Sequence, residues 1–270
     1  MSGDAETDGG DYTNGSVGRR TGPLTLIRRE VLRYLRRPRN TFLPPLITNV
    51  LYFSVFGVIL GSRIGEIAGF SYVLFVLPGL MVLGTISNAF ENSSFTIFHG
   101  RWNEYIHEVV TSPLSYSEQV LAYVAAAAMR GLLIGVLVAV VGAFFTPVTV
   151  YHPLYLVAFM LAISTLFAGF GVAAGLWARD FDYLTVLNQF ILRPLVFFGG
   201  VFYSLDVLPD LWRTLSLANP MVYMVNGVRF AFLDYYEVDP NVSLLVLSGA
   251  AVVVVVGDVL LFARGYGLTD

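Results

Sequence analysis

The chain has 270 residues, of which 56% are hydrophobic and 13% are charged, and its formal net charge is −3. Its mean hydropathy is +0.70. Soluble domains are typically about 45–50% apolar, so this composition predicts a membrane protein. The sequence contains no cysteine, which excludes disulfides, thiol nucleophiles and cysteine metal sites.

Lysine is absent as well, because all 16 residues counted as lysine or arginine are arginine. A Walker A loop needs a lysine that reaches the β- and γ-phosphates of ATP. Schiff-base chemistry also needs a lysine. Any process that this chain drives with ATP would therefore need another chain to bind the nucleotide.

Residues 1–22 are rich in glycine, aspartate, threonine and serine and contain few apolar side chains. Such a segment cannot bury enough apolar surface to fold, and we expect a disordered acidic tail. The acidic start and the missing apolar core exclude a cleavable signal peptide.

A predicted helix follows the tail. Leu24, Ile27, Val31 and Leu35 recur at helical spacing, and arginines occupy its other faces. This pattern is typical of an amphipathic helix that lies in the membrane interface, where anionic headgroups attract the arginines. Pro38 should end the helix. A basic helix in solvent remains the alternative.

Long apolar stretches then alternate with polar connections. A bilayer core about 30 Å thick needs about 20 apolar residues per helix. The sequence predicts an all-α membrane protein with six transmembrane helices. The six spans are residues 41–61, 70–91, 118–146, 153–177, 184–204 and 242–263.

Arginines in the connections predict the orientation, because cytoplasmic flanks carry the excess of positive charge. The N-terminal flank holds Arg19, Arg20, Arg28, Arg29, Arg33, Arg36, Arg37 and Arg39. Both termini are therefore predicted to be cytoplasmic. This orientation places Arg101, Arg179 and Arg264 inside and Arg63, Arg213 and Arg229 outside.

The segment from Arg193 to Arg229 breaks an apolar run at a glycine pair and continues through a proline-punctuated, aromatic stretch. Its marked positions are Gly199, Gly200, Tyr203, Pro209, Asn219, Pro220, Tyr223 and Arg229. In residue type and spacing this segment resembles the signature of ABC-2 type transporter permeases. Phe198 departs from that signature, which usually has a smaller aliphatic residue there.

The resemblance implies that residues 23–270 form an ABC-2 type transmembrane domain, with short re-entrant helices on both sides of Asn219-Pro220. It implies the permease subunit of an ATP-driven exporter in the plasma membrane. Two permease copies, expected to be a homodimer among membrane lipids, would enclose one pathway. A separate ATPase subunit would bind ATP and magnesium; nucleic acid is not expected as a partner.

The implied cargo is a hydrophobic or amphipathic molecule such as a drug or a lipid-like amphiphile. Export of a lipid-linked glycan or polysaccharide remains open, because the same scaffold serves these substrates. A secondary carrier without ATP is a further alternative. Asp180 with Asp182 and Asp206 with Asp210 also allow an intramembrane prenyltransferase, although the predicted topology places the two pairs on opposite sides.

The polar connection between the second and third spans contains a predicted short helix from about Trp102 to Thr111. The resemblance identifies it as the coupling helix that docks onto the ATPase, and an ordinary loop helix is the alternative. The residues expected to carry the coupling are Trp102, Glu104, Tyr105, His107 and Glu108. Glu104 and His107 have a spacing used by carboxylate metal sites, but a single copy predicts no metal.

Three charged residues, Arg130, Arg193 and Asp258, fall inside predicted spans. A charge near the bilayer centre costs at least about 2.5–3.5 kcal/mol on insertion scales, so these side chains must face protein or water. Asp258 could form an ion pair with either arginine, or the charges could line a translocation path.

Three pairs of glycines four residues apart occur in the spans, at Gly57 with Gly61, Gly131 with Gly135 and Gly171 with Gly175. Small residues at this spacing permit close helix contact. We expect most of these contacts to lie within one bundle, so that the pairs by themselves do not predict a dimer.

Overall fold

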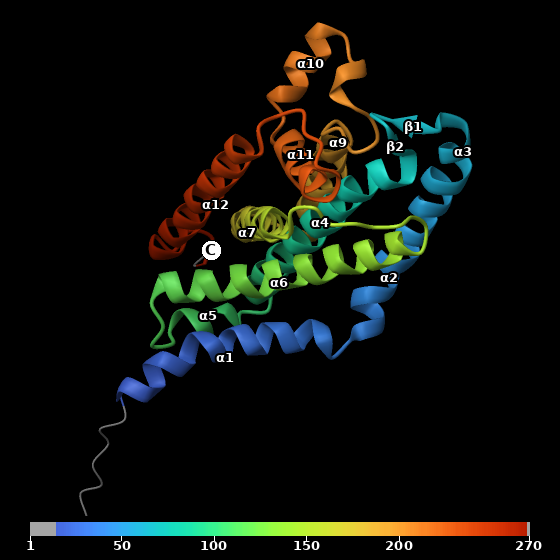
Figure 1. Ribbon diagram of the computed structural model, residues 1–270. Helices are drawn as coiled ribbons and strands as arrows, with labels where there is room; N and C mark the ends of the chain where they lie inside the picture. Colours follow the sequence, from blue (N-terminus) through green and yellow to red (C-terminus); the bar gives the residue numbers. More distant parts are fainter. Residues whose placement is uncertain (1–14, 269–270) are drawn as a thin grey trace, which may run out of the picture.

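The computed structural model describes residues 15–268 as an almost entirely helical bundle. Residues 1–14 of the predicted tail lie outside the described residues, and the rest of that tail is helical. The first helix, α1 (Gly15–Leu35), lies along α6 (Figure 1). It buries Leu26, Glu30 and Tyr34, a face that differs from the predicted apolar face.

The centre of the bundle is α4 (Tyr72–Trp102), which packs against α6 (Tyr116–Ala143) and α7 (Pro153–Trp177). Gly171 of α7 lies so close to α4 that a Cβ atom there would be 2.5 Å from the carbonyl oxygen of Phe90. The glycine pairs of α6 and α7 therefore serve contacts within the bundle, as the sequence predicts.

Two helices form the outside of the bundle. The first is α2 (Pro38–Tyr52), which continues through the π-helix η1 (Phe53–Leu60) into α3 (Gly61–Ile64). The second is α12 (Pro240–Ala263). Both expose many large apolar side chains, as expected of helices that face lipid. A hairpin of β1 (Glu66–Ile67) and β2 (Phe70–Ser71) joins α3 to α4, with Glu66 opposite Ser71.

Five helical stretches of the described chain are long and apolar enough to cross a membrane. They are Pro38–Ile64, Tyr72–Trp102, Tyr116–Ala143, Pro153–Trp177 and Pro240–Ala263. The chain is therefore a multi-pass, all-α membrane protein. These stretches match five of the six predicted spans.

The predicted fifth span, residues 184–204, has a different form. It is a helical run made of α8 (Phe181–Val186), the π-helix η2 (Leu187–Leu192) and α9 (Arg193–Phe197). At about 1.5 Å per residue the run is about 25 Å long, shorter than a hydrocarbon core of about 30 Å. It ends early because Gly200 has a φ of +77°, which turns the chain.

The predicted second span ended at residue 91, but α4 continues to Trp102. The sequence suggested a polar loop there because of its serines and threonine. Ser93 and Ser94 instead donate hydrogen bonds to backbone carbonyls of the preceding turn, and this satisfies their hydroxyl groups inside a helix. Both side chains are buried.

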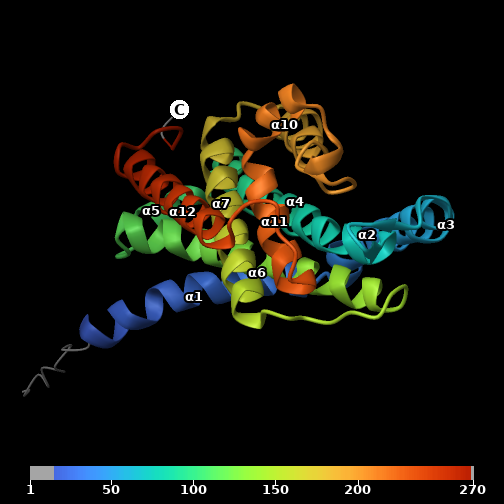
Figure 2. The same ribbon diagram turned by 45° about the horizontal axis from the view of Figure 1, so that its top comes forward.

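Between α9 and α12 lie η3 (Leu205–Val207), α10 (Asp210–Leu217) and α11 (Pro220–Leu233). Helix α11 packs beside α4 and α7 (Figure 2), whereas α10 projects from the end of the molecule. The short helix α5 (Ile106–Val110) and the end of α12 lie at the opposite end of the bundle from the β-hairpin (Figure 1).

Candidate functional site

The loop after α4 carries the residues predicted to form the coupling helix. The helix is shorter than predicted, because the chain turns after Trp102 and Glu104 has a φ of +61°. Ile106 and Val109 anchor α5 in the core with 1% and 5% exposure. Trp102, Glu104, His107 and Glu108 are exposed, and Tyr105 is half-buried. The loop therefore presents exposed polar and charged side chains, including Glu104 and Glu108, on a buried base.

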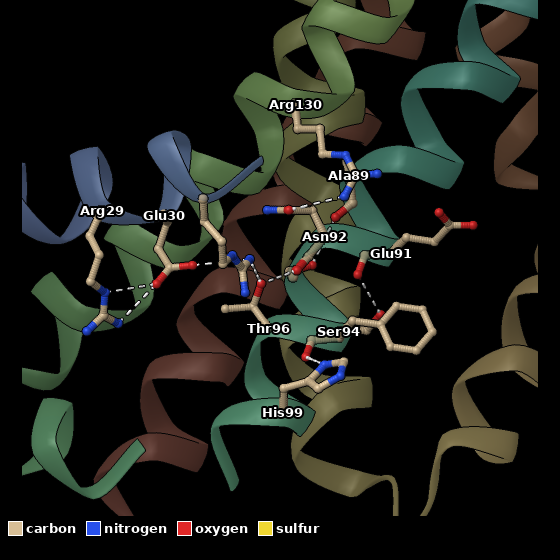
Figure 3. Close-up of polar contacts among 12 residues, drawn as sticks. Arg29, Glu30, Ala89, Glu91, Asn92, Ser94, Thr96, His99 and Arg130 are labelled. Carbon is tan, nitrogen blue, oxygen red and sulfur yellow. Dashed lines mark hydrogen bonds and ion pairs between the residues drawn. The ribbon is translucent and has the colours of Figure 1, made fainter. Parts of the chain in front are cut away.

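Arg33 of α1 links its own helix to α4 and lies beside Tyr105 of this loop. Its Nη2 lies 3.1 Å from Oε2 of Glu30 in the same helix, and it donates a hydrogen bond to Thr96 of α4. Figure 3 shows Glu30 also held by Arg29, whose Nη2 lies 3.0 Å from Oε1. Burial raises the pKa of Tyr105, although the positive charge of nearby Arg33 acts in the opposite direction.

Arg101, at the end of α4, binds the C-terminal end of α7. Its Nη1 donates to the carbonyl oxygens of Gly175, Leu176 and Ala178 at 2.9, 2.7 and 2.9 Å. The last carbonyls of a helix have no intrahelical partner and carry partial negative charge, so an arginine satisfies them well. The bases of α4 and α7 are thereby joined beside the loop of α5.

A polar stripe runs along α4 on the side that faces α1, α2 and α6. It includes Asn88, Glu91, Asn92 and Thr96, which follow one another at helical spacing. Two cavities of about 340 and 260 Å³ open along this stripe, and both are lined by Glu91 and Arg130. Figure 3 shows Arg130 directed toward Asn92. The bundle thus contains a polar region within its spans.

The predicted ion pair between Asp258 and an arginine is wrong. Asp258 is 1% exposed, and neither of its carboxylate oxygens has a hydrogen-bond partner among the described residues. It faces α7 near Gly169, whereas Arg130 and Arg193 line the cavity beside α4. All three fall inside predicted spans, but a position within a span does not give the direction of a side chain.

The signature residues meet where α9 turns toward α11. Gly199 packs so closely on α11 that a Cβ atom would be 2.5 Å from Cβ of Met221. Asn219 accepts a hydrogen bond from the Met221 amide at 3.0 Å and donates one to the carbonyl of Leu195 at 2.8 Å. It therefore caps α11, whose first residue is Pro220, and ties the helix to α9.

Two signature tyrosines bond backbone carbonyls at the ends of neighbouring helices. The hydroxyl of Tyr203 donates to the carbonyl of Phe198 at 3.0 Å, and that of Tyr223 donates to the carbonyl of Leu217 at 2.9 Å. Pro209 immediately precedes α10. These contacts hold backbone groups that would otherwise lack helical partners.

Arg229 completes this cluster. It lies on α11, in the connection between α9 and α12, and is 1% exposed. Its Nη2 donates to the carbonyl of Gly200 at 2.7 Å, and its guanidinium carbon lies 3.8 Å from the ring centre of Phe75. Arg229 therefore joins α11, α4 and the glycine turn.

Comparison with known proteins identifies the family of this arrangement. The family model described as ABC-2 type transporter matches residues 24–233, which include the whole cluster around Arg229. The chain belongs to the ABC-2 type transporter family. This confirms the family that the segment from Arg193 to Arg229 indicated. ABC-2 type chains of this kind are transport components rather than enzymes, which is against the prenyltransferase alternative.

Relatives of this ABC-2 type chain match it over most of its length. It is 37% identical over 244 residues to the inner membrane transport permease YadH of Escherichia coli K12, covering 89% of this chain and 94% of that permease. It is 22% identical over 231 residues to nodulation protein J of Rhizobium leguminosarum bv. trifolii, covering 85% and 88%. Nodulation protein J of Sinorhizobium fredii is 24% identical over 212 residues.

Several residues of the ABC-2 type chain were not singled out by the sequence. Glu30 and Thr96 form the junction with Arg33, and Arg101 binds α7. Glu91 accepts a hydrogen bond from Asn188 of η2 at 2.6 Å. The helical spacing of polar residues from Asn88 to Thr96 was the signal that could have revealed the stripe.

Proposed function

We propose that this chain is the permease subunit of an ATP-driven exporter in the plasma membrane, with both termini in the cytoplasm. Two copies would enclose a pathway for a hydrophobic or amphipathic substrate. The run from Phe181 to Phe197 would be a short span, the fifth along the chain, and would bring the total to six. Helices α10 and α11 would enter the membrane from outside and return to the same side. ATP and magnesium would be held by a separate ATPase chain.

The observation that carries this proposal is the surface around α5. It is exposed and carries Glu104 and Glu108. Its base is buried through Ile106 and Val109, and the interactions of Arg33 connect it to α1 and α4. A soluble partner docked on such a surface could displace α5 and, through these contacts, the spans attached to it. The ATPase can drive export only if it binds one conformation of the permease better than another.

The test is co-purification of the tagged chain from its native membrane, with ATP hydrolysis measured on the purified complex. Replacing Glu104 and Glu108 by arginine should lower the amount of bound ATPase about tenfold or more, because reversed charges oppose docking. Glu66→Arg is the matched control, because Glu66 is exposed on the β-hairpin far from α5. Export of cargo by the chain without any nucleotide-hydrolysing partner would refute the proposal.

The second permease copy is proposed to pack on the face formed by η2 and α9. Phe190 and Phe198 are 71% and 63% exposed there. Native mass spectrometry should show a dimer that Phe190→Arg weakens, whereas Leu245→Arg on the exposed side of α12 should not. Equal dimerisation of the two variants would exclude this face.

A further inference from the structure

The larger cavity along α4 lies between α2, α4, α6 and α9 and has a volume of about 340 Å³. Its polar lining includes Thr48 and Asn49 of α2, Ser87 and Asn88 of α4, Arg130 of α6 and Arg193 of α9. Thr48 and Arg193 are also exposed, so the cavity opens on the surface of the bundle. A polar cavity at the depth of the spans is costly unless it has a ligand or water to satisfy it.

Positive charge in this cavity exceeds what its own lining neutralises. Arg130 donates to the amide oxygens of Asn92 and Asn88 at 3.3 and 3.4 Å, and its Nε is buried without a partner. Arg193 has no hydrogen bond or ion pair among the described residues. In the part of the chain that the structure describes, Glu91 is the one carboxylate of the lining; it accepts a hydrogen bond from Asn188 at 2.6 Å, and its negative charge offsets part of the positive charge of Arg130.

The neighbouring cavity of about 260 Å³ extends the same site, because Arg130 and Glu91 line both. Arg33 lines the second cavity, but its charge is already balanced by Glu30 at 3.1 Å. Arg130 and Arg193 form no direct ion pair among the described residues, and their two positive charges face the single negative charge of Glu91 in the lining. Guanidinium groups bind phosphate and carboxylate through paired hydrogen bonds, and this attraction is strong where water is scarce.

Apolar side chains also lie at this cavity. Tyr52 and Phe197 are among its lining residues. Phe190, on the same helical run as Phe197, and Phe198, directly after that run, are exposed. A ligand bound by the two arginines would therefore meet apolar side chains along the rest of its length. This combination matches a molecule with one anionic end and one hydrocarbon end.

We infer that the cavity binds the phosphate-like headgroup of an anionic amphiphile, held by Arg130 and Arg193, with the hydrocarbon part along α2 and α9. As a statement about cargo, this inference deepens the proposed transport function and rests on it. The shared chemistry is a phosphate group, which could also arrive as free inorganic phosphate, and the test separates the two.

The test measures binding of radiolabelled dodecyl phosphate to the full-length chain in neutral maltoside micelles. Unlabelled dodecyl phosphate should displace the label, whereas dodecyltrimethylammonium and inorganic phosphate should not at the same concentration. Replacing Arg130 and Arg193 together by glutamine should raise the Kd at least about tenfold, because charge-assisted hydrogen bonds are lost. Arg63→Gln, which removes the same charge from exposed α3, should leave the Kd unchanged.

Equal Kd values for the wild type and the double variant would overturn the inference, as would displacement by dodecyltrimethylammonium. Displacement by inorganic phosphate at an equal concentration would overturn the inference that the ligand is an amphiphile and would assign the site to free phosphate. If the double variant does not elute as a single species, Arg193→Gln alone supplies the comparison. No ATPase is present in this assay, so its result is independent of whether the chain binds one.

Discussion

The contact between Arg229 and Phe75 allows a quantitative test of the cluster that joins α11 to α4. Arg229 is fully buried, donates to the carbonyl of Gly200 at 2.7 Å and lies 3.8 Å from the ring centre of Phe75. A hydrogen bond to a charged group contributes about 1.5–3 kcal/mol. A desolvated cation–π contact contributes about 2 kcal/mol.

Arg229→Met removes both interactions and also removes the cost of burying a charge, so the net loss of unfolding free energy should be smaller, about 1–3 kcal/mol. The cation–π part is isolated by combining this change with Phe75→Leu in a double-mutant cycle. Unfolding in mixed detergent micelles should give a coupling free energy of about 1–2 kcal/mol. A coupling within about 0.3–0.5 kcal/mol of zero, the ordinary additivity error, would refute the reasoning.

Three further predictions concern packing and charge. Gly171→Ala should lower the unfolding free energy by about 1–3 kcal/mol because its Cβ would overlap the carbonyl of Phe90. Gly249→Ala, where a Cβ would have nothing within 4 Å, should raise the unfolding free energy by about 0.5–1 kcal/mol through helix propensity. Thermal unfolding that ranks the two variants in the reverse order would contradict the close approach of α7 to α4. Asp258→Asn should leave the unfolding free energy equal to that of the wild type or raise it, since the carboxylate is buried without a hydrogen-bond partner. Its effect should add to that of Arg193→Ala, and strong coupling between the two changes would show that the ion pair exists. Glu30→Gln should cost about 1–2 kcal/mol, because its arginine partners are partly exposed, and the same measurement on exposed Glu66→Gln should show no loss.

Much of the fold could be predicted because the bilayer imposes a length on each span. Five spans follow directly from apolar stretches, and the segment from Arg193 to Arg229 indicated the family that the comparison confirms. The fifth predicted span extended too far, because hydropathy carried it past the glycine pair to residue 204, whereas the positive φ of Gly200 turns the chain there.

The errors at the site arise from side-chain direction. The polar residues after Glu91 looked like a loop, although their hydroxyl groups bond to the helix itself. Asp258 and the two arginines were paired because all three fall inside predicted spans, but they lie against different neighbours. The roles expected of Trp102, Glu104, Tyr105, His107 and Glu108 in coupling stay predictions, and the structure supplies the exposed surface on which to test them.

The hydrogen bonds of Arg101 to three carbonyl oxygens at the end of α7 have a consequence for motion. The two hydrogens of Nη1 are shared among three carbonyl oxygens, which restricts sliding of the adjacent ends of α4 and α7 past each other. A displacement of the neighbouring α5 would therefore move the ends of these two helices together.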